Sequence, residues 1–452
     1  MAALSDSHDS YAALRAPNFR DYLVGNFLGT IGRQAVTAAA AWEIYRWTNS
    51  ATALGLVGLA NVVPLLLLSL PAGALADRID RLRIIVHSQW MLAVLSAALA
   101  ALSFWNNEVP AWAPLRAGNA ALRAIAGVFE RHAVPGELHF DRPALPLMFL
   151  LLFVMASVRV LAWPARSSVI PRLLPRNALS NAITWNSSAF EIATISGPAL
   201  AGFVVAWLDF QAVYLLDATL GLVSCMLIGR VRCLPAAEPT TPAAHHVGQD
   251  WLVGARFIWH RKIILGANTL DLFATLLGAA TALLPVFADK ILHTDSIGLG
   301  WLQAAPSLGA VSMATWLAHR PPLERPGRVM LWSVAGFGAS ILIFGLSHWF
   351  WVSFLALIAG GALDNISVVV RQSLIQLLTP DALRGRVTAV NQIFIGTSNE
   401  AGALRAGLMG ALVGPVNAVL IGGACTISVV LLVARGVPAL RRVPALHTLH
   451  PE

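Results

Sequence analysis

Long apolar stretches alternate with short polar connections along almost the whole chain. Each stretch approaches or exceeds the roughly 20 apolar residues that a helix needs to cross the hydrocarbon core of a bilayer. The pattern therefore predicts an all-α membrane protein with twelve transmembrane helices. These helices are expected over residues 19–45, 54–76, 84–105, 146–170, 181–206, 211–229, 263–287, 297–318, 329–347, 349–371, 387–410 and 415–434.

Two connections are longer than the others and predict how the chain is divided. Residues 230–262 hold a Pro-, Ala- and Thr-rich linker followed by an amphipathic stretch, which we expect to lie as a helix on the cytoplasmic face. Residues 106–145 carry apolar side chains at helical spacing, which predicts a helix on the external surface. The expected division is an N-terminal six-helix bundle over 1–229, a C-terminal six-helix bundle over 263–434 and a cytoplasmic tail over 435–452.

Composition and charge also indicate a membrane protein. Of the 452 residues, 57% are hydrophobic and 12% are charged, whereas soluble domains have about 45–50% apolar and about 25% charged residues. The formal net charge is +8, and the arginines gather in connections on one side of the predicted bundle. The positive-inside rule then places both termini in the cytoplasm and the chain in the inner membrane, so the lipid bilayer explains the basic residues without a nucleic-acid partner.

The two halves of the chain repeat each other. At a constant offset of 205 residues, identical residues recur through the fourth and fifth predicted helices and their counterparts in the second half. The matched residues of the first half are Arg166, Ser168, Ile170, Leu173, Pro175, Asn186, Gly197, Ala201 and Gly202. Such repeats are typical of secondary transporters, in which two six-helix pseudo-repeats surround a site at the middle of the membrane.

The connection after the second predicted helix carries closely spaced acidic and basic residues, reading G-A-L-A-D-R-I-D-R-L-R over residues 73–83. An acid and a base at a helix end can form an ion pair in one conformation and lose it in another. The run resembles the signature loop G-x-x-x-D-[RK]-x-G-[RK]-[RK] of the major facilitator superfamily, from which Asp80 and Leu82 depart. This resemblance implies a gating role for Gly73, Asp77, Arg78, Arg81 and Arg83.

The fifth predicted helix contains small residues four apart, together with a proline. Small residues let helix backbones approach closely, and Pro198 removes a helical hydrogen bond. Residues 193–202, with Gly197, Pro198 and Gly202, resemble the antiporter motif G-x-x-x-G-P-x-x-G-G of exporters in the same superfamily, with alanine at two of its glycine positions.

Three further stretches resemble one branch of that superfamily, the bacterial exporters that include the enterobactin exporter and multidrug efflux proteins. They cover residues 16–20, 163–175 and 379–387. This resemblance implies efflux of a siderophore or a drug-like compound, driven by proton entry.

Ionisable residues within the predicted membrane helices are candidates for the transport site, because a charge there costs at least about 2.5–3.5 kcal/mol on insertion scales. The candidates are Arg33, Arg159, Glu191, Asp271, Asp364, Glu400 and Arg405, with Asn26 on the same face as Arg33 and Asn391 on the same face as Arg405. We expect Glu191, Asp271 and Glu400, in that order, to be candidates for the proton-carrying carboxylate. We also expect Arg159 and Glu191, on successive helices at similar depth, to pair. A purely structural ion pair is the alternative for each.

Signatures of other functions are missing. The chain has no P-loop, nucleophile elbow or zinc-type histidine cluster, and its three cysteines are isolated. We therefore expect no enzymatic activity, no cofactor and no metal, and an ion gradient as the energy source.

The favoured function is export of a small amphipathic molecule, siderophore or drug-like, by a monomer that works by proton antiport and alternating access. The alternatives are an uptake permease or lysolipid flippase of the same fold, and a membrane scaffold or sensor that transports nothing.

Overall fold

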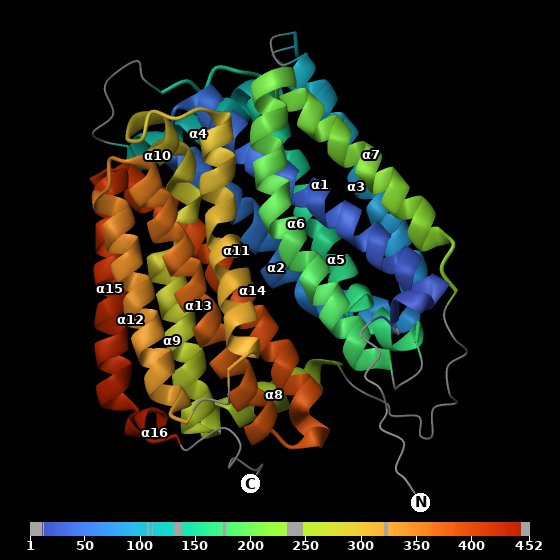
Figure 1. Ribbon diagram of the computed structural model, residues 1–452. Helices are drawn as coiled ribbons and strands as arrows, with labels where there is room; N and C mark the ends of the chain where they lie inside the picture. The colour runs from blue at the N-terminus through green and yellow to red at the C-terminus, as the bar shows by residue number, and fades with distance from the viewer. Residues whose placement is uncertain are drawn as a thin grey trace, which may run out of the picture.

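The computed structural model describes residues 11, 13–105, 108–110, 112–130, 138–174, 178–232, 247–320 and 324–443. Within these ranges the chain forms helices and no β-strand, and Figure 1 shows the long helices packed side by side. The first group of helices is α1 (Pro17–Thr48), α2 (Ala51–Arg78), α3 (Arg81–Phe104), α4 (Ala113–Phe129), α5 (Ala144–Val169), α6 (Leu179–Leu208) and α7 (Phe210–Gly229). The chain continues with α8 (Val247–His260), and the second group is α9 (Lys262–Gly278), α10 (Leu284–Lys290), α11 (Ser296–Ala318), α12 (Pro326–Leu346), α13 (Phe350–Leu378), α14 (Asp381–Val413), α15 (Pro415–Gly436) and the short α16 (Pro438–Arg441).

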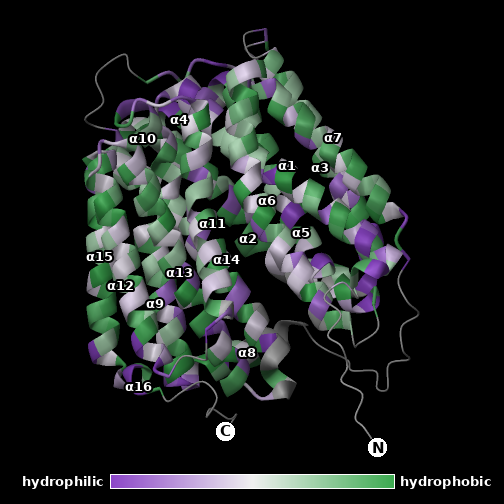
Figure 2. Cartoon of the chain, in the orientation of Figure 1, coloured by the Kyte–Doolittle hydropathy of each residue, from purple (hydrophilic) through white to green (hydrophobic). Residues whose placement is uncertain are grey.

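The helices confirm the predicted all-α membrane protein. Within the described ranges, nine helical segments are long and apolar enough to cross a bilayer, namely α2, α3, α5, α6, α7, α9 with α10, α12, α13 and α15. The remaining predicted membrane helices, α1, α11 and α14, are of similar length but more polar. They pack against several of the nine, and the charged residues of α1 and α14 are of the kind that usually face other helices rather than lipid. Figure 2 shows hydrophobic residues along the helices and hydrophilic residues gathered toward their ends.

The seventh predicted span, over residues 263–287, lies within one apolar segment long enough to cross the membrane, but its helix is interrupted. The chain leaves the α-helix after Gly278 and forms a 3₁₀ turn over Thr281–Leu283 before α10 begins. Pro285 lies in the first turn of α10, where its missing N–H costs no helical hydrogen bond. The break therefore falls where glycine and proline make a straight helix least favourable.

Helix ends follow local chemistry. The side chain of Ser50 accepts a hydrogen bond from the Ala53 amide at the start of α2, and Asp295 accepts one from the Gly298 amide at the start of α11. Such caps satisfy amides that have no partner within the helix. Gly414 has a φ of 85°, a backbone conformation that suits glycine, and it separates α14 from α15.

The two groups of helices meet along two pairs, α2 with α14 and α6 with α11. Glycines allow close contact in both places. A Cβ on Gly407 would lie 2.3 Å from the Gly55 nitrogen, and a Cβ on Gly202 would lie 2.4 Å from the Ser296 carbonyl oxygen. Small residues thus bring the helix backbones of the two groups together.

The two ends of the bundle differ in how the groups are joined. We call the end at which α1 begins and α15 ends the termini end, and the opposite end, which carries α4, the α4 end (Figure 1). The largest cluster of buried apolar side chains lies toward the α4 end and includes residues of both groups. There the Tyr45 hydroxyl of α1 also donates a hydrogen bond to Asp289 Oδ2 of α10, at 3.0 Å. Among the described residues, the clusters toward the termini end each belong to one group, with α8 joining the second.

The two long connections both contain the expected helices. α4 lies within the segment 106–145, and beyond its end Glu130 accepts hydrogen bonds from the Ser50 hydroxyl and the Thr52 amide, at 2.5 and 2.8 Å. α8 packs on α14, and a Cβ on Gly254 would lie 2.8 Å from the Arg386 carbonyl oxygen. Each connection is therefore attached to the membrane bundle.

Candidate functional site

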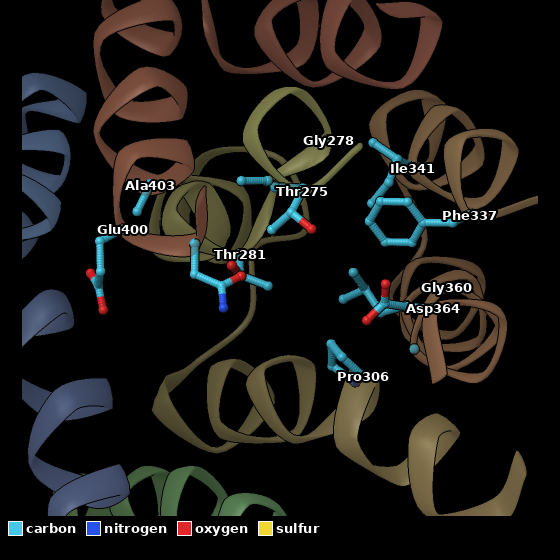
Figure 3. Close-up of a pocket in the computed structure, with 15 residues that line it drawn as sticks. Thr275, Gly278, Thr281, Pro306, Phe337, Ile341, Gly360, Asp364, Glu400 and Ala403 are labelled. Carbon is cyan, nitrogen blue, oxygen red and sulfur yellow. The ribbon is translucent and has the colours of Figure 1, made fainter. Parts of the chain in front are cut away.

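A cavity of about 350 Å³ lies among α9, α11, α12, α13 and α14, beside the break between α9 and α10. Two carboxylates line it, Asp364 from α13 and Glu400 from α14, together with the hydroxyl-bearing Thr275. Figure 3 shows the two carboxylates on opposite sides of the space, with the ring of Phe337 on the side of Asp364. Its lining contains no Lys, Arg or His from the described part of the chain, and we call it the acidic cavity.

Glycines set the shape of the acidic cavity. A Cβ on Gly278 would lie 2.8 Å from Phe337 Cε1, so the glycine at the end of α9 leaves room for the ring. A Cβ on Gly361 would lie 1.9 Å from the Pro306 carbonyl oxygen. The backbones of α11 and α13 are thus in direct contact beneath the cavity, which fixes the position of α13 and its Asp364.

Asp364 lies close to a buried ion pair between Arg371 and Asp271. The Arg371 Nη1 to Asp271 Oδ2 distance is 2.8 Å, and the two side chains are 2% and 7% exposed. Both charges act electrostatically on Asp364, which itself has no hydrogen-bond or ion-pair partner among the described residues. Because Asp271 is neutralised by Arg371, Asp364 is the carboxylate on this side that is free to receive a proton or a ligand.

Glu400 lies both in the acidic cavity and at the contact between the two groups of helices. Asn61 of α2 hydrogen-bonds to Glu400, and the Asn61 Oδ1 atom accepts a hydrogen bond from Arg159 Nη2 of α5 at 3.0 Å. A Cβ on Gly58, also in α2, would lie 3.0 Å from the Glu400 carbonyl oxygen. Asn61 therefore bridges an arginine of the first group and a carboxylate of the second, and we call this chain of contacts the Asn61 bridge.

The expected pair of Arg159 and Glu191 does not form. Arg159 contacts Asn61, whereas the half-buried Glu191 has no ion-pair partner among the described residues. Although α5 and α6 are successive in the chain, α5 packs on α2 and α3, and α6 packs on α1 and α11. The two side chains are thus held by different neighbours, and proximity in sequence was a poor guide to contact.

Arg166 and Arg371 occupy equivalent positions in the repeat, but their side chains have different partners. Arg371 reaches Asn391 Oδ1 at 3.4 Å in addition to Asp271. Arg166 donates to Asn26 Oδ1 at 3.3 Å and to Gln89 Oε1 at 2.5 Å, and both acceptors are neutral. The arginine of the second group is therefore paired with an acid, and that of the first group is held by amides.

Arg33 extends this basic region of the first group. Its Nη2 donates to the Thr30 hydroxyl at 2.6 Å, and its charge interacts with those of Arg159, Arg166 and Asp217. The first group therefore carries an arginine-rich interior, whereas the cavity of the second group is lined by acids.

Three polar residues of the interior were not singled out in the sequence. Asp217 Oδ2 accepts a hydrogen bond from the Ser96 hydroxyl at 2.5 Å, and Glu43 accepts one from the Tyr214 hydroxyl at 2.6 Å. Both carboxylates lie within predicted membrane helices, so the rule applied to the other charged residues would have found them. Asn61 is neutral, and no charge rule could select it.

The residues of the signature-like loop lie around the end of α2 and the start of α3, with the side chain of Asp77 outside the described residues. Arg81 Nη1 donates to the Ser168 carbonyl oxygen of α5 at 3.1 Å, while Arg78 is exposed. The departure at Asp80 has a structural reason, because its Oδ1 accepts a hydrogen bond from the Arg83 amide at 3.0 Å and caps α3. Gly73 lies one turn before the end of α2.

The antiporter-like motif lies at a contact between helices. A Cβ on Gly197 would lie 2.5 Å from Gln34 Cβ of α1, and Gly202 faces α11 as described above. A Cβ on Gly300 of α11 would lie 2.7 Å from the Pro198 carbonyl oxygen. The motif thus packs α6 against both groups of helices. Arg405, in contrast, lies beside Gly422 of α15 and does not line the acidic cavity.

A cavity lined by carboxylates inside one of two packed groups of membrane helices is typical of a membrane transporter. The chain belongs to the Major Facilitator Superfamily, whose family model matches residues 22–395. It is 25% identical over 430 residues to the enterobactin exporter EntS of Citrobacter koseri, covering 94% of this chain and 93% of that protein. It is 24% identical to EntS of Escherichia coli O1:K1 / APEC, covering 88% and 87%.

Solved structures with the same fold include transporters of different kinds. A D-xylose-proton symporter matches with a TM-score of 0.67 at 15% identity, covering 95% of this chain and 99% of that one. A bacterial homolog of the human lysosomal transporter Spinster, in an inward-facing and unoccupied conformation, matches with a TM-score of 0.64 at 13% identity, covering 96% and 100%. These likenesses support the fold of two six-helix pseudo-repeats.

Proposed function

We propose that this transporter exports a small amphipathic molecule in exchange for protons. The observation that carries the proposal is the position of Glu400, which lines the acidic cavity and also takes part in the Asn61 bridge between the two groups of helices. Because the same carboxylate faces the cavity and contacts the first group, its protonation can change how the two groups of helices pack against each other. The similarity to exporters named for enterobactin supports the outward direction.

The exchange follows from the charge of Glu400. When ionised, Glu400 is attracted through Asn61 toward Arg159, which favours contact between α2 and α14. A proton removes that attraction and leaves Asp217, within the first group, as the negative charge that acts on Arg159, so the contact weakens. A ligand-dependent equilibrium between two conformations requires such a difference in interaction between them.

The two groups act as the moving bodies in this proposal. The apolar cluster and the contact of Tyr45 with Asp289 close the α4 end, while the termini end has no described cluster that joins the groups. With both termini in the cytoplasm, this arrangement gives access from the cytoplasm. Opening the α2–α14 and α6–α11 contacts at the α4 end would then release the substrate outside.

The test measures accumulation of fluorescent dyes and siderophores in cells with and without the protein, with a protonophore added midway. Lower accumulation that rises on uncoupling is expected for the wild type and for Glu324→Gln, a control in the exposed connection before α12. Glu400→Gln should abolish the proton-dependent part. Equal accumulation with and without the protein across the panel would contradict export, and proton-dependent efflux by Glu400→Gln at the control level would remove Glu400 from the mechanism.

A further inference from the structure

We propose that the acidic cavity binds an organic cation, with its positive centre at Asp364 and its apolar body against Phe337. This inference rests on the proposed transport function and names the chemical class of its substrate. Two observations support it: the residues that line the cavity, and the way the charged residues around it are already paired.

The charge balance of the cavity favours a cation. Asp364 and Glu400 line it, and Arg371, the arginine whose charge acts on Asp364, already pairs with Asp271 at 2.8 Å. The nearby Arg159 reaches Glu400 through Asn61, from the side of the first group. Asp364 is therefore left as a partly buried carboxylate without a hydrogen-bond or ion-pair partner among the described residues, where a cationic ligand would be stabilising.

Uncharged parts of the lining also suit an organic cation. The ring of Phe337 lies on the same side as Asp364 in Figure 3, and an aromatic face attracts a cation within about 6 Å of its centroid. Ile341, Leu357 and Pro306 add an apolar wall, and the cavity of about 350 Å³ is within the range of small-molecule sites. An organic cation can thus pair with Asp364 while its apolar body packs against this wall.

The cation and protons should compete for the same carboxylates. The charged groups that face Asp364 are Asp271 of α9 and Arg371 of α13, and Arg159 of α5 faces Glu400. α11 has no charged residue, and the one on α12, Arg328, lies in its first turn at the termini end. Lowering the pH neutralises Asp364 and Glu400. Cation binding should therefore weaken because the cavity loses its negative charges, and the lining has no Lys, Arg or His to change charge as well. Competition of this kind gives exchange of a cation for protons.

The experiment compares two probes of the same shape and opposite charge, tetraphenylphosphonium and tetraphenylborate, binding to the full chain in lipid nanodiscs. Equilibrium dialysis at pH 8 and pH 5.5, with empty nanodiscs subtracted, gives both dissociation constants. At pH 8 we expect the dissociation constant of the phosphonium to be at least about tenfold lower than that of the borate. The affinity for the phosphonium should fall at pH 5.5.

Two variants test the location of the site. Asp364→Asn should remove the preference for the phosphonium at pH 8, whereas Asp141→Asn, the same change at a residue 75% exposed near α4, should leave it unchanged. Gel filtration checks that both fold. If Asp364→Asn does not fold, Phe337→Leu replaces it, and a preference undiminished by that change would overturn the location.

The outcomes separate this inference from the export proposal. Equal binding of the probes, or tighter binding of the borate, overturns the cation site even if the cells show proton-driven efflux. Tighter borate binding that is lost in Arg33→Gln would move the ligand to the arginines of the first group. Selective phosphonium binding without efflux in cells would support the site and overturn export.

Discussion

Single polar side chains decide how the charges of the interior are connected. Glu400 and Arg159 belong to different groups of helices, and the neutral Asn61 connects them. An amide suits this position because it offers an acceptor to the guanidinium and a donor to the carboxylate. Replacing it by an apolar residue of similar size leaves both charges with one partner fewer.

Asn61→Leu is expected to destabilise the protein by about 1–3 kcal/mol, the usual cost of an unsatisfied buried polar group. The melting temperature in detergent should fall, and proton-dependent efflux should weaken. Asn417→Leu is the matched control, because Asn417 is exposed on α15 and donates only to the Val413 carbonyl oxygen. Equal melting temperatures for the two variants would show that the Asn61 bridge contributes nothing to stability.

The sequence predicted charged residues better than their partners. Their charge within predicted membrane helices selected Asp271, Asp364 and Glu400, and the structure places all three in or beside one cavity. Neither the Arg371–Asp271 pair nor the Asn61 bridge could be derived, because partners depend on which helices are neighbours. That is a property of packing and not of order along the chain.

The close helix contacts in this protein depend on glycine residues. At the α2–α14 contact, a Cβ on Gly407 would lie only 2.3 Å from the Gly55 nitrogen. A backbone atom cannot move aside as a flexible side chain can, so any larger residue must separate the helices. The small-residue pattern in the sequence indicated close helix contact, but the partner helix became known only from the structure.

Gly407→Val should separate α2 from α14 and lower stability by about 1–3 kcal/mol, the usual cost of overpacking. It should also reduce efflux, since the proposed cycle forms and breaks this contact. Gly229→Ala at the end of α7 is the control, because no atom lies within 4 Å of a Cβ added there. Wild-type melting temperature and efflux for Gly407→Val would contradict the tight contact.

A shared apolar cluster joins the two groups at the α4 end, whereas the described apolar clusters toward the termini end each belong to one group. Apolar periodicity predicted the number and order of the membrane helices, and the structure supports the all-α fold. The interruption after Gly278 was missed because residues 263–287 are apolar enough on average to read as one span, although Gly278 and Pro285 flank the break. Hydropathy measures whether a segment suits a membrane, and it does not register a local break in helical hydrogen bonding.

The proposed orientation predicts which end reacts with a membrane-impermeant maleimide in intact cells. In a chain whose three cysteines are replaced by alanine, Trp112→Cys before α4 should be labelled from outside. Trp259→Cys on α8 should be labelled only after the cells are opened. Both positions are well exposed, at 67% and 72%, so a difference would report the side of the membrane. The reverse pattern would invert the topology.

The interruption of α9 has a consequence for the electric field in the cavity. A helix leaves its last carbonyl groups without partners and carries the negative end of its dipole there. Gly278, Ala279 and Ala280, at and just after this end, line the same space as Asp364. The end of α9 therefore adds a negative contribution that does not depend on pH, opposed by the amides of the 3₁₀ turn and α10 that begin just beyond it. Acidification should then weaken a bound cation's hold by removing the carboxylate charges alone, and leave this backbone contribution in place.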